Sequence, residues 1–367
     1  MATLHALLAV IRRNLAIATR RRDLIVQAVA VPIVVLTLAS IIFGASDAWP
    51  IAVIDKDNTT ASRQLVTALN DTKGARGPYY RIIETDPSRA RKDLTDGRIQ
   101  LAIEIPRGFE RDRTLHTSTY NINTDTMKNV RLRLVTTANL YDERVGLAQI
   151  HVTFAKAKPV DVSRTAFMGG SAIILALLLG CALIAANLFA MEQEIRTTKE
   201  IILSPLGAPI ASVGAALAAC ALSLITAMPT GIMALLFGFR SGPLELARGA
   251  VIVLPAMLAA AGVGVQTAQG LRTHRAIQPV IILLALGTYF AAGGFIPVPG
   301  LPPIARGFSS VWPPSFVFEW ANPLLHGFTT ELPWTRLLAL TIAAAVGLAV
   351  ASWSGRREIL RPAHGGQ

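Results

Sequence analysis

Six stretches of the chain contain no charged residue and are long enough to cross a membrane as helices, which takes about 20 mostly apolar residues. They are Leu24–Ser46, Thr165–Met191, Ile201–Phe239, Gly249–Leu271, Ala276–Ala305 and Leu337–Gly355. Pro205 and Pro209 exclude the start of the third run from its helix, and Pro229 predicts a kink within it. The pattern predicts an α-helical integral membrane protein with six transmembrane helices, at 24–46, 167–190, 210–237, 249–269, 277–296 and 337–355.

Composition supports this prediction, because 52% of the residues are hydrophobic and only 16% are charged, against about 25% in soluble domains. The first run is longer than the apolar core of a signal peptide, which holds about 7–15 residues, and we interpret it as an uncleaved anchor. The two cysteines, Cys181 and Cys220, both lie in apolar runs and indicate no disulfide framework.

The net charge of +12 would by itself suggest nucleic acid as a partner, but the positions of the 35 basic residues argue against one. Twelve lie in the short segments 1–23, 191–208, 272–275 and 356–367, and four lie in the opposite short loops. Because Lys and Arg accumulate on the cytoplasmic side, both termini, including the tail 356–367, are predicted to be cytoplasmic. The other 19 fall in segment 47–166, which also carries 15 acidic residues.

Residues 1–22 are predicted to include an amphipathic helix on the cytoplasmic surface. One face holds the apolar residues Leu4, Leu7, Leu8, Ile11 and Leu15, and the other holds Arg12, Arg13, Arg20 and Arg21. Such a helix lies in the interface of the lipid bilayer, with its arginines on anionic headgroups. The alternative is that these arginines act only as a topology signal.

Segment 47–166 alternates predicted strands with predicted helices, which indicates a small α/β or α+β domain inserted between the first two spans, outside the cytoplasm. The strands are Ile51–Asp55, Tyr79–Glu84, Gln100–Ile105 and Thr119–Asn123, and the helices are Ser62–Leu69, Ser88–Asp96 and one from Asp125 to about Phe154. Asp55–Asn58 starts like a calcium loop, but Thr60 and Val66 stand where glycine and an acid are required. We interpret it as a turn that caps the next helix.

A loop at 297–335 is rich in proline and tryptophan, and it is predicted to be extracytoplasmic. Prolines exclude a regular span, and tryptophan suits the membrane interface. Reentrant half-helices and a purely structural loop both remain open as explanations. Glycines in the spans, such as Gly262 and Gly264, are predicted to mark close helix packing.

Catalytic, cofactor and metal motifs are absent from the sequence. No GxxxxGK[ST] loop occurs, no HExxH occurs, and the six histidines lack ligand spacing. The predicted spans carry no ionisable residue, which disfavours transport coupled to protons or ions. Any transport energy should therefore come from another protein.

One dense motif follows the second span, in the cytoplasmic segment 191–208: Met-Glu-Gln-Glu-Ile-Arg-Thr-Thr-Lys-Glu-Ile-Ile-Leu-Ser-Pro, from Met191 to Pro205. It resembles the permease subunit of ABC-2-type exporters, in which this segment reads Glu-x-Glu-x-Gly-Thr-x-Glu-x-Leu-Leu-x-Thr-Pro. Two positions depart from that pattern, with Arg196 in place of glycine and Lys199 in place of an acid. Other segments also resemble this family and occur along the chain in the same order as in the family. They are Ile51–Ser62, Pro106–Phe109, Phe295–Pro297, Leu301-Pro302 and Asn322-Pro323.

The resemblance implies that the segment docks onto a separate ATPase subunit. The implied coupling residues are Glu192, Glu194, Thr197, Lys199, Glu200, Ile201, Ile202 and Pro205. It also implies two ATPase subunits, which would hold ATP and Mg²⁺, and a second permease copy, identical or related. The expected location is a prokaryotic plasma (inner) membrane. The expected cargo is a hydrophobic or amphiphilic compound, such as a drug or lipid, that is exported.

Two other functions remain open from the sequence. A receptor or scaffold would act through the 47–166 domain, which holds over half of the charged residues. A membrane-embedded transferase for lipid-linked substrates would need clustered carboxylates, for which Glu319 and Glu331 are the available candidates.

Overall fold

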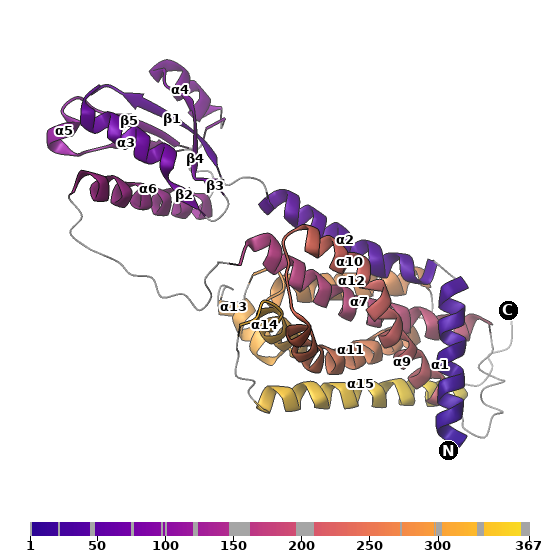
Figure 1. Cartoon of the computed structure of the whole chain (residues 1–367). Coiled ribbons are helices and arrows are strands. Elements are labelled where there is room, and N and C mark those ends of the chain that lie inside the picture. Colours follow the sequence, from indigo (N-terminus) through magenta and orange to yellow (C-terminus); the bar gives the residue numbers. More distant parts are fainter. Residues whose placement is uncertain are drawn as a thin grey trace. The chain divides into compact units, whose positions relative to one another are not determined.

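The computed structural model describes residues 2–20, 23–44, 48–74, 77–96, 98–99, 101–119, 124–146, 162–195, 209–271, 274–296, 298, 303–328 and 334–360. The chain divides into two compact units (Figure 1). One unit, the helical bundle, comprises Met1–Gly44 and Val162–Gln367, and the other, the α/β unit, comprises Ala45–Asp161.

The α/β unit contains a four-stranded sheet with the strand order β4-β1-β5-β6. Strand β1 pairs in parallel with β4 and β5, and β6 pairs antiparallel to β5. A small antiparallel pair, β2 and β3, stands apart. The elements are β1 (Trp49–Asp55), α3 (Thr60–Asp71), β2 (Lys73–Gly74), β3 (Gly77–Pro78), β4 (Tyr80–Glu84), α4 (Pro87–Thr95), β5 (Leu101–Ile105), α5 (Phe109–Asp112), β6 (His116–Thr119) and α6 (Thr124–Val145).

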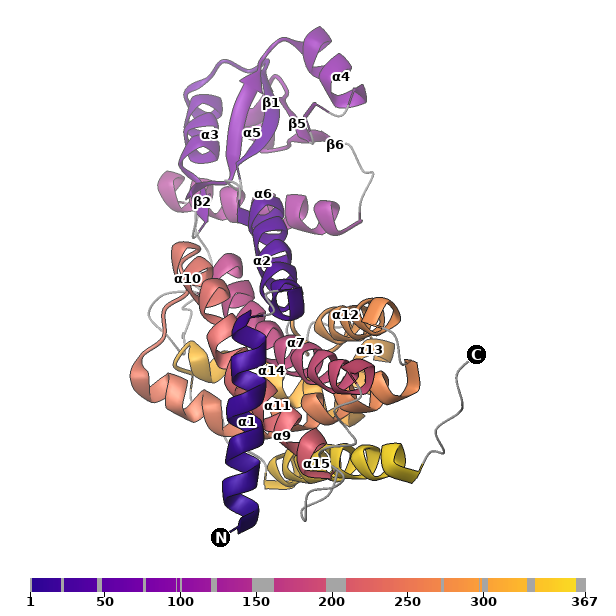
Figure 2. The ribbon, with the colours of Figure 1, turned by 90° about the vertical axis from the view of Figure 1, so that its right-hand side faces the viewer.

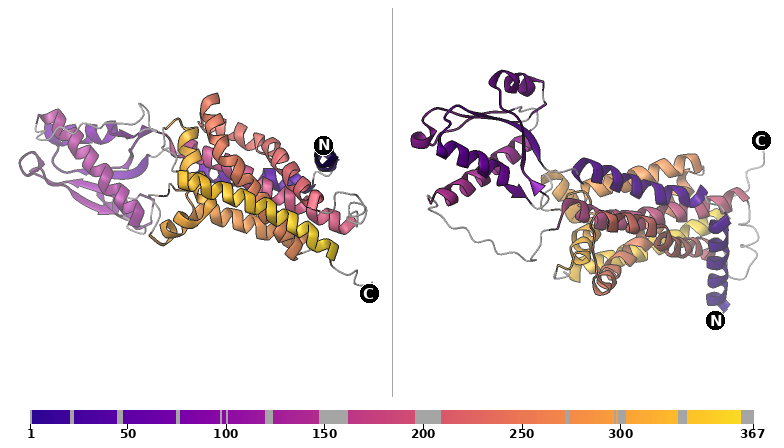
Figure 3. Two further views of the ribbon diagram at one scale, coloured as in Figure 1. Left: turned by 90° about the horizontal axis from the view of Figure 1, so that it is seen from below. Right: turned by 45° about the horizontal axis from the view of Figure 1, so that its top comes forward.

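Helices cover both faces of this sheet (Figure 3). Side chains alternate along a strand, so Ile51 and Val53 of β1 pack with α3 and α6, whereas Ala52 and Ile54 pack with α4. The sequence placed the last strand too late, at Thr119–Asn123, whereas β6 ends at Thr119 and residues 120–123 lie outside the described part. The error arises because β6 is an exposed edge strand without apolar alternation.

The bundle contains only helices among its described residues. They are α1 (Ala2–Arg20), α2 (Asp23–Gly44), α7 (Arg164–Ile195), α9 (Pro209–Thr226), α10 (Met228–Leu236), α11 (Pro243–Leu271), α12 (His274–Ala291), α13 (Pro303–Val311), α14 (Pro313–Leu325) and α15 (Trp334–Leu360). Every one of the six apolar runs therefore includes a helix.

Four helices in the described part are long and apolar enough to cross a membrane: Arg164–Glu194, Pro209–Leu236, Pro243–Leu271 and Trp334–Ser354. Leu4–Arg20 and Ile25–Ile41 would add a fifth if that pair, bent by 67°, forms one span, and Ala276–Ala291 is a shorter apolar helix. The structure is thus that of a multi-pass membrane protein, and the count of six spans stays a prediction.

Helix α7 is the centre of the bundle (Figure 2). It contacts α2, α9, α10, α11, α12 and α14, and 83% of its apolar span is buried, against 28% for α15. Cys181 of α7 and Cys220 of α9 are free thiols with sulfurs 3.1 Å apart. Because α7 contacts so many helices, a displacement of α7 would be transmitted to most of the bundle.

Polar side chains within the apolar helices pair with one another across helix contacts. Gln27 Nε2 of α2 donates to Gln278 Oε1 of α12 over 2.8 Å. Ser354 of α15 donates its hydroxyl to Gln266 of α11 and accepts from Gln269 through its carbonyl oxygen. Hydrogen bonds of this kind stabilise helix association inside a membrane.

Prolines mark where helices start in the second half of the bundle. Helix α10 begins at Met228, next to Pro229, and one turn residue, Ala227, separates it from α9 within the single span Pro209–Leu236. Helices α13 and α14 begin at Pro303 and Pro313, because proline fits the first turn of a helix. Helix α14 buries Phe316, Val317, Phe318 and Ala321 among its neighbours. The predicted loop 297–335 therefore contains two short helices, and its reentry into the membrane stays a prediction.

Candidate functional site

Helix α7 extends beyond its apolar span into the segment that the sequence marks for ATPase coupling. The predicted span ends at position 190, whereas α7 continues to Ile195. Glu192 is buried, with only 4% of its surface exposed, and Glu194 is exposed. Six other predicted coupling residues lie outside the described residues: Thr197, Lys199, Glu200, Ile201, Ile202 and Pro205. The described part of the site is therefore the last turn of α7.

Arg13 of α1 forms an ion pair with Glu192, through its guanidinium Nη2 and the carboxylate Oε1. The Glu192 side chain is 5% exposed and that of Arg13 is 35% exposed, so water screens the pair only in part. Glu192 also lies near the C-terminus of α7, where the helix dipole disfavours a negative charge. The positive charge of Arg13 therefore balances both the charge of the buried carboxylate and the negative end of the helix dipole.

Helix α1 is fixed in this position by packing as well as by charge (Figure 2). It lies against α9, where the side chains of Leu7 and Val10 approach Gly214. Asn14 and Ala18 are fully covered, and Arg13 Nη2 also donates to Asn14 Oδ1 over 3.4 Å. The N-terminal helix thus contacts the helix that precedes the coupling segment and the helix that follows it.

The two predicted faces of this helix are covered by protein only in part, and its place in the bilayer interface stays a prediction. Leu7, Ile11 and Leu15 are partly buried, but Leu4 and Leu8 are 60% and 45% exposed. Among the arginines, Arg12 and Arg20 are exposed as predicted, Arg13 is bound to Glu192, and Arg21 lies outside the described residues. The contact of α1 with α9 covers Leu7 in part and leaves Leu4 and Leu8 exposed, as an apolar face on lipid would require.

A second buried polar cluster joins α14 to α7. Asn322 is fully buried, and its Nδ2 donates to Ser171 Oγ over 2.7 Å and to the Phe167 carbonyl oxygen over 3.2 Å. The Asn322 side chain lies directly over Gly170, where a Cβ would collide with its Oδ1. Sequence analysis noticed Asn322 only as part of an Asn-Pro motif. An amide within an apolar helix was the available signal that it has a buried partner.

We expect Asn322→Ala to lower the free energy of unfolding by about 2 kcal/mol. The substitution removes two hydrogen bonds and leaves buried acceptors of α7 without their donor, which costs about 1–3 kcal/mol. Thermal unfolding in detergent measures the effect. Ser310→Ala is the control, because Ser310 is exposed and bonds only within its own helix. Equal midpoints for the two variants would contradict the expectation.

The two turns that the sequence singled out in the α/β unit are joined to each other. Asp55 Oδ1 accepts from the backbone N–H groups of Asp57 and Asn58 over 3.0 Å, and Thr59 caps α3. Asp57 Oδ1 accepts from the backbone N–H of Gly108 over 2.7 Å. Gly108 has a φ of +87°, which glycine adopts without strain. Asp55–Asn58 is a turn that leads directly into α3, as predicted, but the residue that caps the helix is the next one, Thr59.

This junction predicts a pH dependence in the α/β unit. Hydrogen bonds from the Thr59 hydroxyl and from the backbone at Gly108 lower the pKa of Asp57. A carboxyl whose pKa is lowered by folding stabilises the fold above its unfolded pKa of about 3.9, and it loses that contribution as the pH falls towards the folded value. We therefore expect Asp57→Asn to reduce the unfolding midpoint more at pH 7 than at pH 3. Circular dichroism of both proteins at the two pH values measures this, and an equal reduction would contradict it.

The carboxylates considered for a transferase do not form a described cluster. Glu319 Oε2 accepts from Arg336 Nη1 over 2.6 Å, and the Arg336 guanidinium also lies over the rings of Phe316 and Trp320. Glu331 lies outside the described residues. Glu319 thus has an ion-pair partner that fixes α15 to α14, and the geometry favours a structural role.

Comparison with known proteins identifies a family of membrane proteins, which agrees with the apolar helices of the bundle. The model of the family described as ABC-2 family transporter protein matches residues 22–353. The matched region begins just before α2 and ends within α15, so it spans the α/β unit and the helical bundle apart from α1 and the end of α15. A comparison with curated proteins found no match.

Proposed function

Because this chain belongs to the ABC-2 family of transporter proteins and is the transmembrane subunit of an ABC transporter, we propose that it exports a hydrophobic or amphiphilic compound, driven by a separate ATPase subunit. Two ATPase subunits would hold ATP and Mg²⁺, and two permease copies, identical or related, would enclose the path. Both termini would be cytoplasmic, in a prokaryotic inner membrane, and the α/β unit would lie outside.

The ion pair between Arg13 and Glu192 is the observation that supports ATPase coupling most directly. It ties α1 to the last turn of α7, immediately before the segment proposed to dock onto the ATPase. Since α7 contacts six other helices of the bundle, a push on its end reaches helices on several sides. The proposed route therefore runs from the ATPase through Glu192–Pro205 into α7.

The chemistry of the bundle supports an apolar cargo. The described polar side chains Gln27, Gln278, Gln266 and Ser354 are paired across helices, so they serve helix association. The predicted spans contain no charge that would balance an ionic cargo or carry a coupling ion. An uncharged or amphiphilic compound requires neither.

The experiment is charge reversal at the end of α7 in the full chain, coexpressed with its ATPase subunit. We expect Glu194→Lys, at an exposed position, to reduce copurification of the ATPase about fivefold, which corresponds to about 1 kcal/mol at the contact. Glu192→Lys should reduce it further, but it also removes the ion pair with Arg13.

The matched control is Glu245→Lys, which reverses an acid in the first turn of α11, on the side proposed to face away from the ATPase. The control should copurify the ATPase in wild-type amounts. Wild-type association and ATP hydrolysis in Glu194→Lys and Glu192→Lys would show that this segment does not couple the two subunits.

A further inference from the structure

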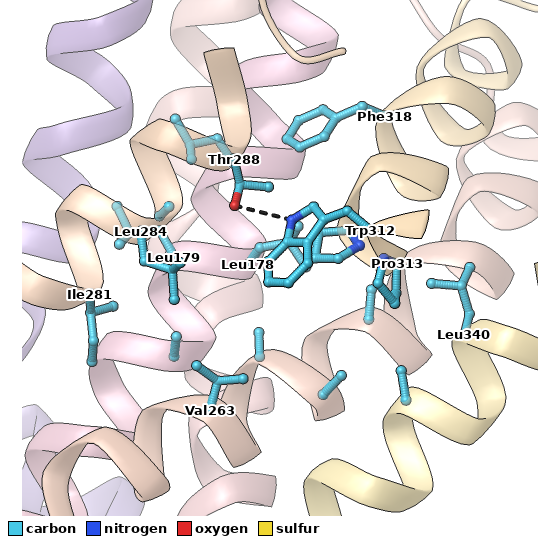
Figure 4. Close-up of a pocket in the computed structure, with 18 residues that line it drawn as sticks. Leu178, Leu179, Val263, Ile281, Leu284, Thr288, Trp312, Pro313, Phe318 and Leu340 are labelled. Carbon is cyan, nitrogen blue, oxygen red and sulfur yellow. Dashed lines mark hydrogen bonds between the residues drawn. The ribbon is translucent and has the colours of Figure 1, made fainter. Parts of the chain in front are cut away.

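An apolar pocket of about 150 Å³, open on one side, lies between α7, α11, α12, α14 and α15 (Figure 4). Each of these helices contributes apolar side chains to its wall, for example Leu179, Val263, Ile281, Phe318 and Leu340. Val263 and Leu284, which line the pocket, are both 44% exposed. None of the 18 described residues that line it is ionisable. The proposed route for ATPase coupling does not use this cavity.

The polar groups at the cavity are directed at each other. The Trp312 indole N–H donates to Thr288 Oγ1 over 3.3 Å, which closes one side of the wall (Figure 4). Trp312 is half-buried, and an indole N–H against an apolar wall is costly to leave without a partner. This bond satisfies the polar group that would otherwise hold a water molecule at the wall. The cavity therefore favours an occupant that needs no hydrogen bond.

Size and shape narrow the occupant further. A volume of about 150 Å³ matches that of an apolar protein cavity that binds benzene or xenon, so the pocket has room for one ring. Here the wall also presents two aromatic side chains, Trp312 and Phe318, which are held by stacking on Phe308 and by an edge contact with Tyr289. Aromatic rings interact favourably with other rings in offset or edge-on arrangements.

We infer that this cavity is a binding site for a single uncharged aromatic ring. The ring would be the apolar end of the compound that the protein transports, so the identity of the natural ligand rests on the proposed function. The site itself depends only on the wall of the cavity. It lies within one copy of the chain, and it requires neither a second copy nor the ATPase.

Binding of fluorobenzene to the full chain in lipid nanodiscs tests the inference, with ¹⁹F NMR saturation transfer as the readout and empty nanodiscs subtracted. Ala343 lines the cavity, whereas Ala345, on the same helix, is exposed. We expect Ala343→Phe to fill the site and weaken binding at least about tenfold. We expect Ala345→Phe to bind as the wild type does.

A variant that enlarges the site provides a second test, in case a larger side chain disturbs the fold. Leu340 is 1% exposed and lines the cavity, so Leu340→Ala should admit a larger ring and bind 1-fluoronaphthalene more tightly than the wild type. Absence of fluorobenzene binding to the wild type, or equal binding by Ala343→Phe and Ala345→Phe, would overturn the inference.

These measurements contain no ATPase, which separates the two proposals. Binding that follows the cavity variants, together with a failure of the ATPase to associate, would leave the ring site standing and refute the exporter coupling. If the ATPase associates with the wild-type chain and fluorobenzene binding does not follow the cavity variants, the ring site alone is refuted.

Discussion

Gly264→Ala should reduce the stability of the bundle by about 3 kcal/mol relative to Gly270→Ala, although both substitutions lie on α11. A Cβ at Gly264 would collide with the backbone carbonyl of Ala182 on α7, whereas a Cβ at Gly270 would meet nothing within 4 Å. Overpacking a core costs about 1–3 kcal/mol, and the upper end applies when the neighbour is backbone that cannot rotate away. Replacing glycine by alanine favours the helix by about 1 kcal/mol in both variants. The difference in stability between the two variants therefore measures the collision alone.

Thermal unfolding of the two variants in the same detergent measures this difference. Gly262→Ala provides an independent check, because its Cβ would collide with the backbone of Gly347 on α15. The same midpoint for Gly264→Ala and Gly270→Ala would mean that the helices separate at little cost, and that close packing of α11 does not hold the bundle together.

These glycines show what the sequence could and could not predict. Small residues in apolar runs predicted close helix packing, and that prediction is confirmed at Gly262 and Gly264. The sequence could not identify the partners, Gly347 and Ala182, because the partner of a small residue is set by how the helices cross. Hydrophobicity therefore predicts that helices exist, and tertiary packing decides which of them touch.

The ends of the helices were predicted less well than their existence. The apolar run of α7 ends at Met191, but helical hydrogen bonding continues to Ile195, because Glu and Gln are good helix formers. In the loop after α12, the high proline content excluded a regular span and left half-helices and a structural loop both open. Short helices are present, and Pro303 and Pro313 stand where α13 and α14 begin, which is where proline is tolerated.

The coupling residues were predicted by resemblance alone, and the structure adds a contact that resemblance did not supply. Periodicity assigned Arg13 to the polar face of an interfacial helix together with Arg12. Its partner Glu192 is 179 positions away in the chain, so no local pattern could have connected them. Only the packing of α1 on α9 brings the two charges together.

Arg13→Ala should therefore behave differently from Arg12→Ala, its neighbour on α1. Arg12 is exposed, and an exposed charge contributes little to stability, at most about 1 kcal/mol. Removing Arg13 withdraws the positive charge bound to a carboxylate that is 5% exposed, and breaking a buried pair costs about 3–5 kcal/mol. Because Arg13 is itself 35% exposed, we expect a smaller loss, of about 2 kcal/mol.

The double variant Arg13→Met/Glu192→Met decides whether the pair acts through charge or through packing. Replacing both members of a buried pair with apolar residues of similar size is often neutral, so the double variant should recover most of the stability lost in Arg13→Ala. If α1 also transmits motion through this contact, the double variant should restore stability without restoring ATP hydrolysis that is stimulated by cargo. Equal unfolding midpoints for Arg13→Ala and Arg12→Ala would instead show that the ion pair does not fix α1 to α7.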